Sequence, residues 1–393
     1  MSSVLKRIEH YTGLGPILLI FAVFIPLAII FEFTHASPTL ILLASALAIV
    51  PLAGMIGEGT EALAEKVGQR AGGLLNATLG NAAELIIAIV ALRQGLVDLV
   101  LASITGSILG NLLLVLGLAL LVGGLKHGVQ KFNAANAGID ATLLVLSVFA
   151  LAIPSFFNQA LEPDFERVEF VSIGVAIAIL VMYALTIVYS FTSHGTAEAE
   201  AETHTAAAHP VAAAPNATVP DPVTREAHAT LGWSTTHALI VLVVAVGFIA
   251  LLSEFLVGAV EPVTEALGLS EFFLGIILIP LVGNAAEHFV AVQVALKNKM
   301  DLSLSIAIGS SLQIALFVAP LLVFISLALG NPMPLEFTSY EVLAVAAAAL
   351  IAAFVSLDGK SIWLEGAMLL MLYVILAVAF FFLLPNTRYE FRK

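Results

Sequence analysis

Long apolar stretches, separated by short polar breaks, follow one another along almost the whole chain. A membrane-spanning helix needs about 20 mostly apolar residues. Stretches of this kind lie at residues 14–32, 39–57, 71–92, 97–123, 139–158, 169–191, 238–256, 272–296, 301–329, 339–357 and 361–384. They are continuously apolar, whereas the strands of a membrane barrel alternate in polarity over about ten residues. The pattern therefore predicts an all-α polytopic membrane protein with about 11 transmembrane helices.

The composition supports this class and argues against others. Hydrophobic residues make up 60% of the chain and charged residues 11%, which is far from the usage of soluble domains. The net charge of −13 argues against a nucleic-acid partner. The absence of cysteine removes disulfides and thiolate metal sites. We expect the lipid bilayer as a partner, and the sequence leaves a homo-oligomer open.

The basic residues predict the orientation, because Lys and Arg are enriched in cytoplasmic loops. With a cytoplasmic amino terminus, most of the 15 basic residues fall on the cytoplasmic side: Lys6, Arg7, Lys66, Arg70, Lys126, Lys131, Arg225, Lys297, Lys299 and Lys360. The carboxyl terminus is then expected on the opposite side. The first apolar stretch is longer than the roughly 7–15 apolar residues of a signal peptide, which favours a retained helix.

One internal repeat organises the chain. Gly-Asn-Ala-Ala-Glu occurs at 80–84 and again at 283–287, an offset of 283 − 80 = 203, and the same offset superimposes Gly106-Ser107 on Gly309-Ser310. Each copy comprises five helices. Since five is odd, the two copies must enter the membrane from opposite sides, which is the inverted-repeat architecture of secondary transporters.

The repeat predicts four parts of the chain. Residues 1–35 form an additional first helix, 36–192 the first repeat with helices 2–6, and 233–393 the second repeat with helices 7–11. Between the repeats, residues 193–232 are rich in Ala, Pro, Thr, His and acids, which indicates a cytoplasmic linker, either a solvated helix or disordered. The alternative is a regulatory segment that senses cations through its histidines.

Two glutamates, one in each repeat, are the main candidates for chemistry. Glu84 and Glu287 each lie in an apolar span, where a charged carboxylate near the helix centre costs about 2.5–3.5 kcal/mol. Such a placement indicates function more often than structure. The alternatives are a structural hydrogen-bonding role or a position nearer the membrane surface.

Further oxygen donors accompany these acids. Asn81 and Asn284 precede the glutamates by three residues and so share their helix faces. Candidates on the partner helices are Ser107 and Asn111, which are four residues apart, and Ser310 and Gln313, which are three residues apart. Carboxylate, amide and hydroxyl oxygens suit a hard cation such as Ca²⁺, and they suit Mg²⁺ less well because Mg²⁺ loses its waters reluctantly.

Two glycines of the repeated motif add a backbone contribution. Gly80 and Gly283 are candidates for a local unwinding that turns carbonyl groups toward the ion. Two ionised glutamates carry a charge of −2, which one divalent cation neutralises. Without the cation, burial and mutual repulsion favour protonation, so that cation and protons compete for the same carboxylates.

A second set of residues predicts a proton pathway or gate. Its members are Glu58, Glu254, Glu261 and His288. For the acids, solvated positions at the membrane interface are an equal alternative. For His288, a hydrogen-bonded packing role is the simpler interpretation.

These motifs resemble those of a known family. Residues 72–89, GGLLNATLGNAAELIIAI, and the block 261–323 are similar to the two α-repeats of the Ca²⁺/H⁺ exchangers, the cation/proton exchanger branch of the Ca²⁺:cation antiporter superfamily. The resemblance implies Glu84 and Glu287 as central ligands and proton carriers, and helices 2 and 7 as a moving gate. The long acidic helix of that family is represented only by Glu198, Glu200 and Glu202.

The sequence therefore predicts a secondary active transporter that exchanges Ca²⁺, or a similar divalent cation, for H⁺ by alternating access. The alternatives are a Na⁺/Ca²⁺ exchanger and a Mn²⁺-type cation antiporter. No cofactor is expected apart from the transported ions. An enzyme is disfavoured because H-E-x-x-H and G-x-S-x-G motifs are absent. A passive channel is disfavoured because it gives no reason for duplicating a buried acid in opposed repeats.

Overall fold

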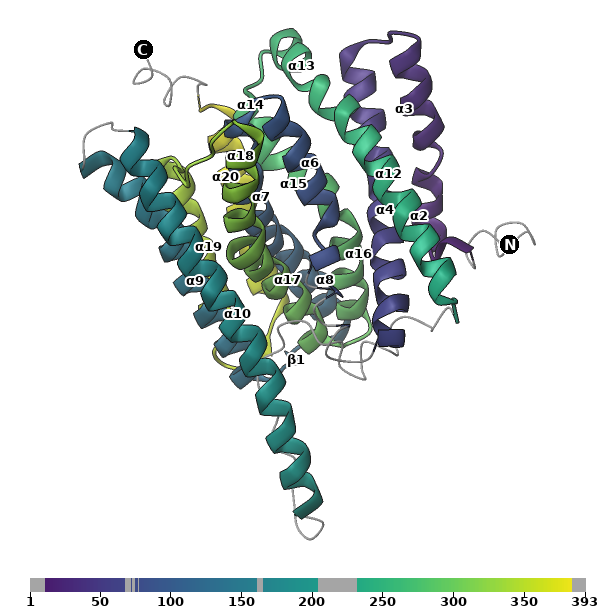
Figure 1. Cartoon of the computed structure of the whole chain (residues 1–393). Helices are drawn as coiled ribbons and strands as arrows, with labels where there is room; N and C mark the ends of the chain where they lie inside the picture. Colours follow the sequence, from purple (N-terminus) through teal and green to yellow (C-terminus); the bar gives the residue numbers. More distant parts are fainter. Residues whose placement is uncertain are drawn as a thin grey trace.

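Apolar helices dominate the part of the chain that the computed structural model describes, namely residues 11–67, 72, 75–76, 78–160, 165–203 and 232–383 (Figure 1). Within it, eight helices are long and apolar enough to cross a membrane: Pro16–Phe33, Pro38–Val67, Val97–His127, Ala134–Phe157, Glu166–Tyr189, Thr235–Leu267, Met300–Leu329 and Trp363–Phe381. A ninth span is counted if Glu271–Gly283 and Ala285–Leu296, which are bent by 61° to each other, cross together. The prediction of an all-α polytopic membrane protein is confirmed.

Two of the predicted spans remain to be placed. The span at 71–92 falls partly outside the described residues, and its described end is the helix Ala82–Arg93. The span at 339–357 is an apolar helix of 17 residues, Ser339–Val355. The total of 11 therefore stays a prediction.

The first half of the chain is built from ten described elements. They are α2 (Pro16–Phe21), α3 (Phe24–Phe33), α4 (Pro38–Val67), α6 (Ala82–Arg93), α7 (Val97–Leu109), the π-helical turn η1 (Gly110–Val115), α8 (Leu116–His127), β1 (Gln130–Lys131), α9 (Ala134–Ala160) and α10 (Phe165–Thr203). The helix α10 continues 11 residues beyond the predicted boundary at 192. Alternating Ala and Glu are strong helix formers, which explains the extension. The linker residues 204–231 lie outside the described residues.

The second half contains twelve described elements. They are α12 (Thr235–Gly258), α13 (Val260–Leu267), α14 (Glu271–Phe273), η2 (Leu274–Leu278), α15 (Ile279–Gly283), α16 (Ala285–Leu296), α17 (Met300–Gln313), η3 (Ile314–Val318), α18 (Ala319–Leu329), α19 (Ser339–Val355), β2 (Lys360–Ser361) and α20 (Trp363–Phe381). Adding 203 to the bounds of α6, 82 and 93, gives 285 and 296, the bounds of α16. The local structure therefore repeats with the sequence.

The equivalent helices α6 and α16 start close together and run in opposite directions. Their first turns are linked through glycines of the repeated motif, because Gly283 lies against Glu84. The end of α6 carries Arg93, which contacts α12 near α13, whereas the end of α16 contacts Lys126 of α8 beside β1. In Figure 1, α13 lies at the upper end of the molecule and β1 at the lower end. The two helices thus diverge from the middle toward opposite ends.

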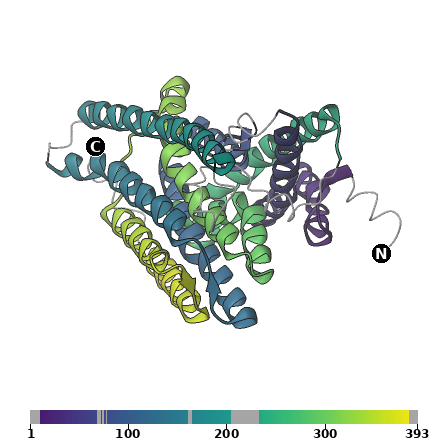
Figure 2. The same cartoon turned by 90° about the horizontal axis from the view of Figure 1, so that it is seen from below.

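The helices form two groups that lie side by side. One group consists of α2, α3, α4 and α12, which pack against one another and lie together at one side in both Figure 1 and Figure 2. We call it the peripheral group. The remaining helices form the core group, and α6, α15 and α16 of the core contact α4 or α12. The candidate residues of the repeats therefore lie where the two groups meet.

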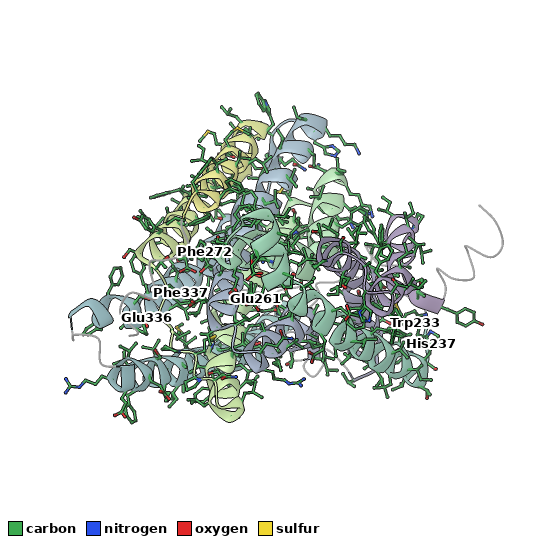
Figure 3. All side chains as sticks on the ribbon, turned by 90° about the horizontal axis from the view of Figure 1, so that it is seen from above. Trp233, His237, Glu261, Phe272, Glu336 and Phe337 are labelled. Carbon is green, nitrogen blue, oxygen red and sulfur yellow. The ribbon has the colours of Figure 1, made fainter. Side chains whose placement is uncertain are left out.

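Aromatic residues and a short antiparallel strand pair lie at the ends of the bundle. At the start of α12, the rings of Trp233 and His237 meet edge to face at 4.6 Å, and Figure 3 shows both at one side of the molecule. Amphipathic rings of this kind are enriched at membrane interfaces. The antiparallel pair β1–β2 joins Gln130 to Ser361 between the two halves of the chain. Such contacts tie the ends of helices that are far apart in sequence.

Candidate cation site

The two repeated glutamates lie in the first turns of α6 and α16. Asn81 and Asn284 precede these helices with φ values of −95° and −94°, and each glutamate is the third helical residue after its asparagine. The amino end of a helix carries a partial positive charge, which stabilises a carboxylate placed there. Both carboxylates are thus held at a broken helix in the middle of the bundle.

Glycine allows these acids to approach the opposite repeat. A Cβ atom on Gly283 would lie 2.8 Å from Glu84 Cγ and 3.5 Å from its Oε1. A Cβ atom on Gly80 would lie 3.8 Å from Glu287 Oε1. Each glutamate therefore contacts the glycine of the other motif, and the two acids lie close together as predicted. The proposed turning of backbone carbonyls at these glycines stays a prediction.

Amide and hydroxyl groups connect the two repeats around the acids. Asn81 Nδ2 donates a hydrogen bond to Gln313 Oε1, and Asn284 Nδ2 donates to Ser107 Oγ at 3.2 Å. A third bond runs from Asn111 Nδ2 to Ser310 Oγ at 3.0 Å. All three join residues of opposite halves and are buried. The structure therefore brings together every residue that the sequence predicted for the cation site.

The arrangement is not symmetric, although the sequence motif is. By symmetry Asn81 would contact Ser310, but it bonds to Gln313, and Ser310 accepts from Asn111 instead. Asn111 Oδ1 also accepts a 3.1 Å hydrogen bond from His288 Nε2. At the equivalent positions the other repeat has Leu85 and an isoleucine, residue 314. Asn111 is one of the oxygen donors that the sequence predicted on the partner helices, but its contacts have no polar counterpart in the second repeat.

Several buried oxygens in this region have no hydrogen-bond partner among the residues that the structure describes. They are Asn81 Oδ1, Asn284 Oδ1 and Glu287 Oε2. A buried acceptor without a partner costs about 1–3 kcal/mol, so native proteins satisfy nearly all of them. Three such atoms on neighbouring helix starts form a set of oxygen donors of the type that Ca²⁺ binds.

The donor set is rich in amides and poor in acids. Among the described residues, no three His, Asp or Glu side chains are grouped as metal ligands. The candidate site consists of two carboxylates together with amide and hydroxyl oxygens. A Ca²⁺ ion takes six to eight oxygens, and water supplies the remainder at many sites.

A cavity of about 540 Å³ connects the site with one end of the bundle. It is lined at that end by Asn133, Asn298 and Lys299, which flank β1 and the start of α17, and at its inner end by Glu287 and Gln313. Residues of α4 and α9 form other parts of its wall. The cavity gives water and ions a route to Glu287.

On the other side of the site, α7 and η2 pack backbone against backbone. A Cβ atom on Gly106 would overlap the carbonyl of Ile276, and one on Gly275 would lie 2.8 Å from the carbonyl of Leu99. Glycine alone allows helices to approach so closely. This contact separates the candidate site from the α13 end of the bundle.

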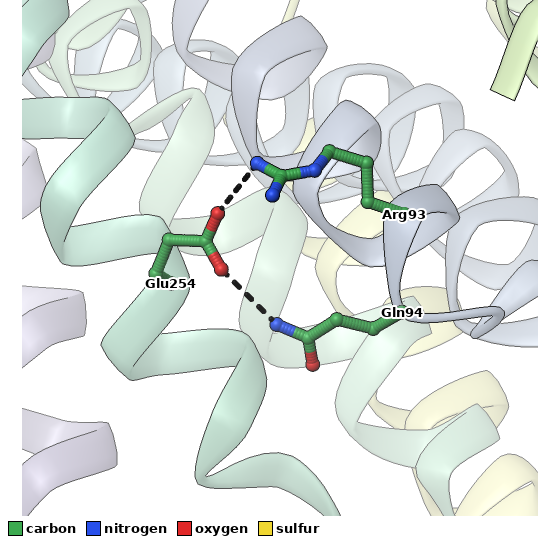
Figure 4. A network of polar contacts seen from close by, with 3 residues as sticks. All are labelled: Arg93, Gln94 and Glu254. Carbon is green, nitrogen blue, oxygen red and sulfur yellow. Dashed lines mark hydrogen bonds and ion pairs between the residues drawn. The ribbon is translucent and has the colours of Figure 1, made fainter.

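The four residues predicted for a proton pathway or gate lie in different places. Glu58 lines the cavity, and His288 bonds to Asn111 beside the site. Glu254 instead pairs with Arg93 at 2.9 Å and accepts a 3.4 Å bond from Gln94, as Figure 4 shows. Glu261 is exposed on α13 near the same end of the bundle and is labelled in Figure 3. The structure does not bring these last two to the cavity.

Sequence reasoning did not identify Asp140 in the cavity wall. Asp140 lies on α9 and lines the cavity. The predicted span at 139–158 begins beside it, so the sequence pattern alone suggests an ordinary residue at the end of a helix. Its place in the wall depends on the packing of α9 against α17.

Comparison with known proteins gives a consistent result. The profile of the family described as sodium/calcium exchanger protein matches residues 37–192 and 237–382. A Ca²⁺/H⁺ antiporter of Aphanothece halophytica is 44% identical over 360 residues, covering 91% of this chain and 94% of its own. The Ca²⁺/H⁺ antiporter ChaA of Bacillus subtilis is 41% identical, covering 91% and 97%.

A solved structure matches over the same length. The structure of native YfkE has a TM-score of 0.76 and 38% sequence identity, and the match covers 93% of this chain and all of that one. The family profile and the structural match both extend over the two halves of the molecule. This multi-pass membrane protein belongs to the sodium/calcium exchanger protein family.

Proposed function

We propose that this chain is a secondary active antiporter that exchanges Ca²⁺ for H⁺, with Glu84 and Glu287 as the shared site for both ions. The observation that carries this proposal is the group of unpartnered buried oxygens at Asn81, Asn284 and Glu287. A divalent cation would satisfy them and would neutralise the two carboxylates. The relatives named as Ca²⁺/H⁺ antiporters support the same pair of ions.

The coupling follows from the charge of the site. When Ca²⁺ is bound, its two positive charges neutralise the two ionised glutamates. When each glutamate carries a proton, the site is neutral without Ca²⁺. Either loaded site crosses the low-dielectric part of the membrane at lower cost than the empty site with its charge of −2. The exchange is therefore obligatory in this scheme, because the empty charged state returns slowly.

Access alternates through motion between the two helix groups. The site lies between the peripheral and core groups, with a cavity toward the β1 end and the α7–η2 contact toward the other. In this scheme α4 and α12 shift against α6 and α16, so that the cavity closes and a path opens at the α13 end. Inverted repeats allow this exchange of two similar arrangements.

The end with the cavity is assigned to the cytoplasm. Lys126, Lys131, Lys297, Lys299 and Lys360 lie around β1 and the loops near it. Basic loops stay in the cytoplasm. The cavity is then the route by which cytoplasmic Ca²⁺ reaches Glu287.

Transport in everted membrane vesicles tests the function. We expect an acidic lumen to drive Ca²⁺ uptake that is independent of Na⁺ and collapses when a protonophore removes the pH gradient. Uptake that requires a Na⁺ gradient would instead assign a Na⁺/Ca²⁺ exchanger. Preferred transport of Mn²⁺ in a competition series would assign a Mn²⁺-type antiporter.

Substitution of either central acid tests the site. Glu84→Gln and Glu287→Gln each remove one charge and one proton carrier, so we expect exchange to fall at least about 100-fold, in the range of groups that act directly on the transported ion. The control is Glu265→Gln, the same chemical change on the exposed face of α13. Amounts of folded protein are compared by size-exclusion chromatography. Substantial exchange by either variant would remove that residue from the site.

A further inference from the structure

A polar face on α9 forms part of the cavity wall. Asn133, Asn136 and Asp140 lie at spacings of three and four residues, which places them on one side of the helix. All three line the cavity. Asn133 Oδ1 accepts hydrogen bonds from the backbone of Ala135 and Asn136, and so it caps the start of α9. The side chain of Asp140 is thus held about two turns inside the helix.

Asp140 differs from Asp301, another acid in the cavity wall, in its hydrogen-bond partners. Its residue is only 6% exposed, and its carboxylate has no hydrogen bond or ion pair among the described residues. Asp301, by contrast, accepts a hydrogen bond from the backbone N–H of Asn133 and fastens α9 to the first turn of α17. This hydrogen bond gives Asp301 a structural role. Within the part of the chain that the structure describes, Asp140 is a buried carboxylate in the cavity wall with no hydrogen-bond or ion-pair partner.

The position of Asp140 along the cavity lies between the entrance and the central site. The helices α9 and α17 start at the same end, where Asn133 contacts Asp301. Asp140 is seven residues beyond Asn133, and Ser310 is nine beyond Asp301. At 1.5 Å per helical residue these are depths of about 10 Å and about 14 Å. An ion that moves inward along the wall therefore meets Asp140 before it meets Glu287.

The other half of the molecule lacks this acid. Asn133 caps the start of α9, and Thr338 caps the start of α19, so the two helices can be aligned at these residues. Seven residues after the cap, α9 has Asp140 (140 − 133 = 7), whereas α19 has Val345 (345 − 338 = 7). The seam between α19 and α7 contains a cavity of only about 20 Å³. Its acid, Glu341, is engaged by Thr105 and Thr338. Asp140 is therefore a feature of one face of the transporter.

We propose that Asp140 is a loading site for the divalent cation on the cavity side, where a hydrated Ca²⁺ pauses before it reaches the central glutamates. This rests on the proposed function. A carboxylate in a cleft with low-dielectric walls concentrates cations and raises their rate of arrival. The site consists of one carboxylate, the nearby amide of Asn136 and water molecules that the ion retains. So few protein ligands bind Ca²⁺ weakly and release it rapidly, as a loading site requires.

The transport test measures how the initial uptake rate depends on external Ca²⁺ in everted vesicles. For Asp140→Asn, which keeps shape and removes charge, we expect the KM for Ca²⁺ to rise about 3- to 10-fold with the maximal rate retained. High ionic strength should reduce the difference from wild type. Asp140→Glu should restore most of the KM. The control Asp358→Asn removes an exposed acid near β2 at the same end of the bundle.

A KM that rises no more in Asp140→Asn than in Asp358→Asn would overturn the proposal. A fall in maximal rate at unchanged KM would also overturn it, because that result assigns Asp140 to structure or to the proton step. If the wild type itself shows no exchange, the proposed function fails, and the loading site is then judged by binding alone.

Binding is measured with radioactive Ca²⁺ by equilibrium dialysis of the purified full chain. The variant Glu84→Gln/Glu287→Gln removes the central carboxylates, so we expect one remaining weak site with a dissociation constant on the order of 1 mM, the weak end of protein Ca²⁺ sites. Adding Asp140→Asn should abolish it, and adding Asp358→Asn should not. Residual binding that survives Asp140→Asn would overturn the proposal.

Discussion

At the scale of single residues, the candidate site depends on contacts that glycine permits. The Glu84 side chain occupies the space where a side chain on Gly283 would begin. The pairing of Asn81 with Gln313 and of Asn284 with Ser107 then surrounds the acids with oriented amides. Sequence reasoning identified these residues from their repetition and placement in apolar spans. It did not identify their partners, because the choice between Ser310 and Gln313 depends on a few ångströms of helix displacement.

The glycine contact leads to a prediction. Gly283→Ala places a Cβ atom 2.8 Å from Glu84 Cγ, so the carboxylate or the helix must shift. We expect Ca²⁺/H⁺ exchange to fall at least about tenfold, since misplacement by about 1 Å is enough for large losses in preorganised sites. Exchange in proteoliposomes is the measurement. The control is Gly247→Ala in α12, where the added Cβ meets nothing within 4 Å. Equal activity of both variants would contradict the role given to Gly283.

At the scale of elements, the broken helices and the π-helical turns define the site. The chain bends by 61° between α15 and α16. The π-helical turn η1 contains Asn111 as its second residue, and η3 begins directly after Gln313. Irregular turns of this type occur frequently at functional sites. Apolar pattern predicted the spans but not these interruptions, because one extra residue in a turn leaves the overall hydrophobicity unchanged.

Motion between the two helix groups can be tested at the pair Arg93–Glu254. This exposed pair joins α6 of the core group to α12 of the peripheral group (Figure 4). As an exposed ion pair it contributes at most about 1 kcal/mol, so it does not lock the groups. The chain contains no cysteine, so Arg93→Cys/Glu254→Cys introduces only two thiols. We expect a short bifunctional maleimide to abolish exchange in this variant.

The controls for this experiment are the two single-cysteine variants treated with the same reagent. They should keep most of their exchange, because one thiol cannot bridge the helices. If the cross-linked double variant transports at the rate of the untreated one, the two groups do not need to move apart at this end. Alternating access by motion of α12 against α6 would then be wrong.

At the scale of the whole molecule, a duplicated sequence forms an asymmetric structure. The cavity reaches the site from the β1 end, while close backbone packing of α7 and η2 separates the site from the other end. In a membrane, backbone groups must be satisfied within the protein, so both halves form helices regardless of which end is open. The asymmetry arises from how the halves pack.

The orientation leads to a prediction of its own. Lys297 and Glu261 lie at opposite ends of the bundle, and each is replaced by a single cysteine in a separate variant. A membrane-impermeant maleimide should label Lys297→Cys in everted vesicles and Glu261→Cys in right-side-out vesicles. Labelling is read by gel shift, and permeabilised vesicles show that both thiols react. The reverse pattern would place the amino terminus outside and would assign the cavity to the opposite compartment.

The sequence by itself determined the membrane class, the repeat and the pair of central acids. Its continuously apolar stretches form helices in lipid, and a carboxylate repeated in such stretches indicates a functional site because its burial is costly. The tertiary structure decided which amides contact which hydroxyls, where the cavity opens and that Asp140 lies in its wall. Two repeats with the same apolar pattern and the same central motif do not specify by pattern alone which of their interfaces is open, because that choice depends on long-range packing between them.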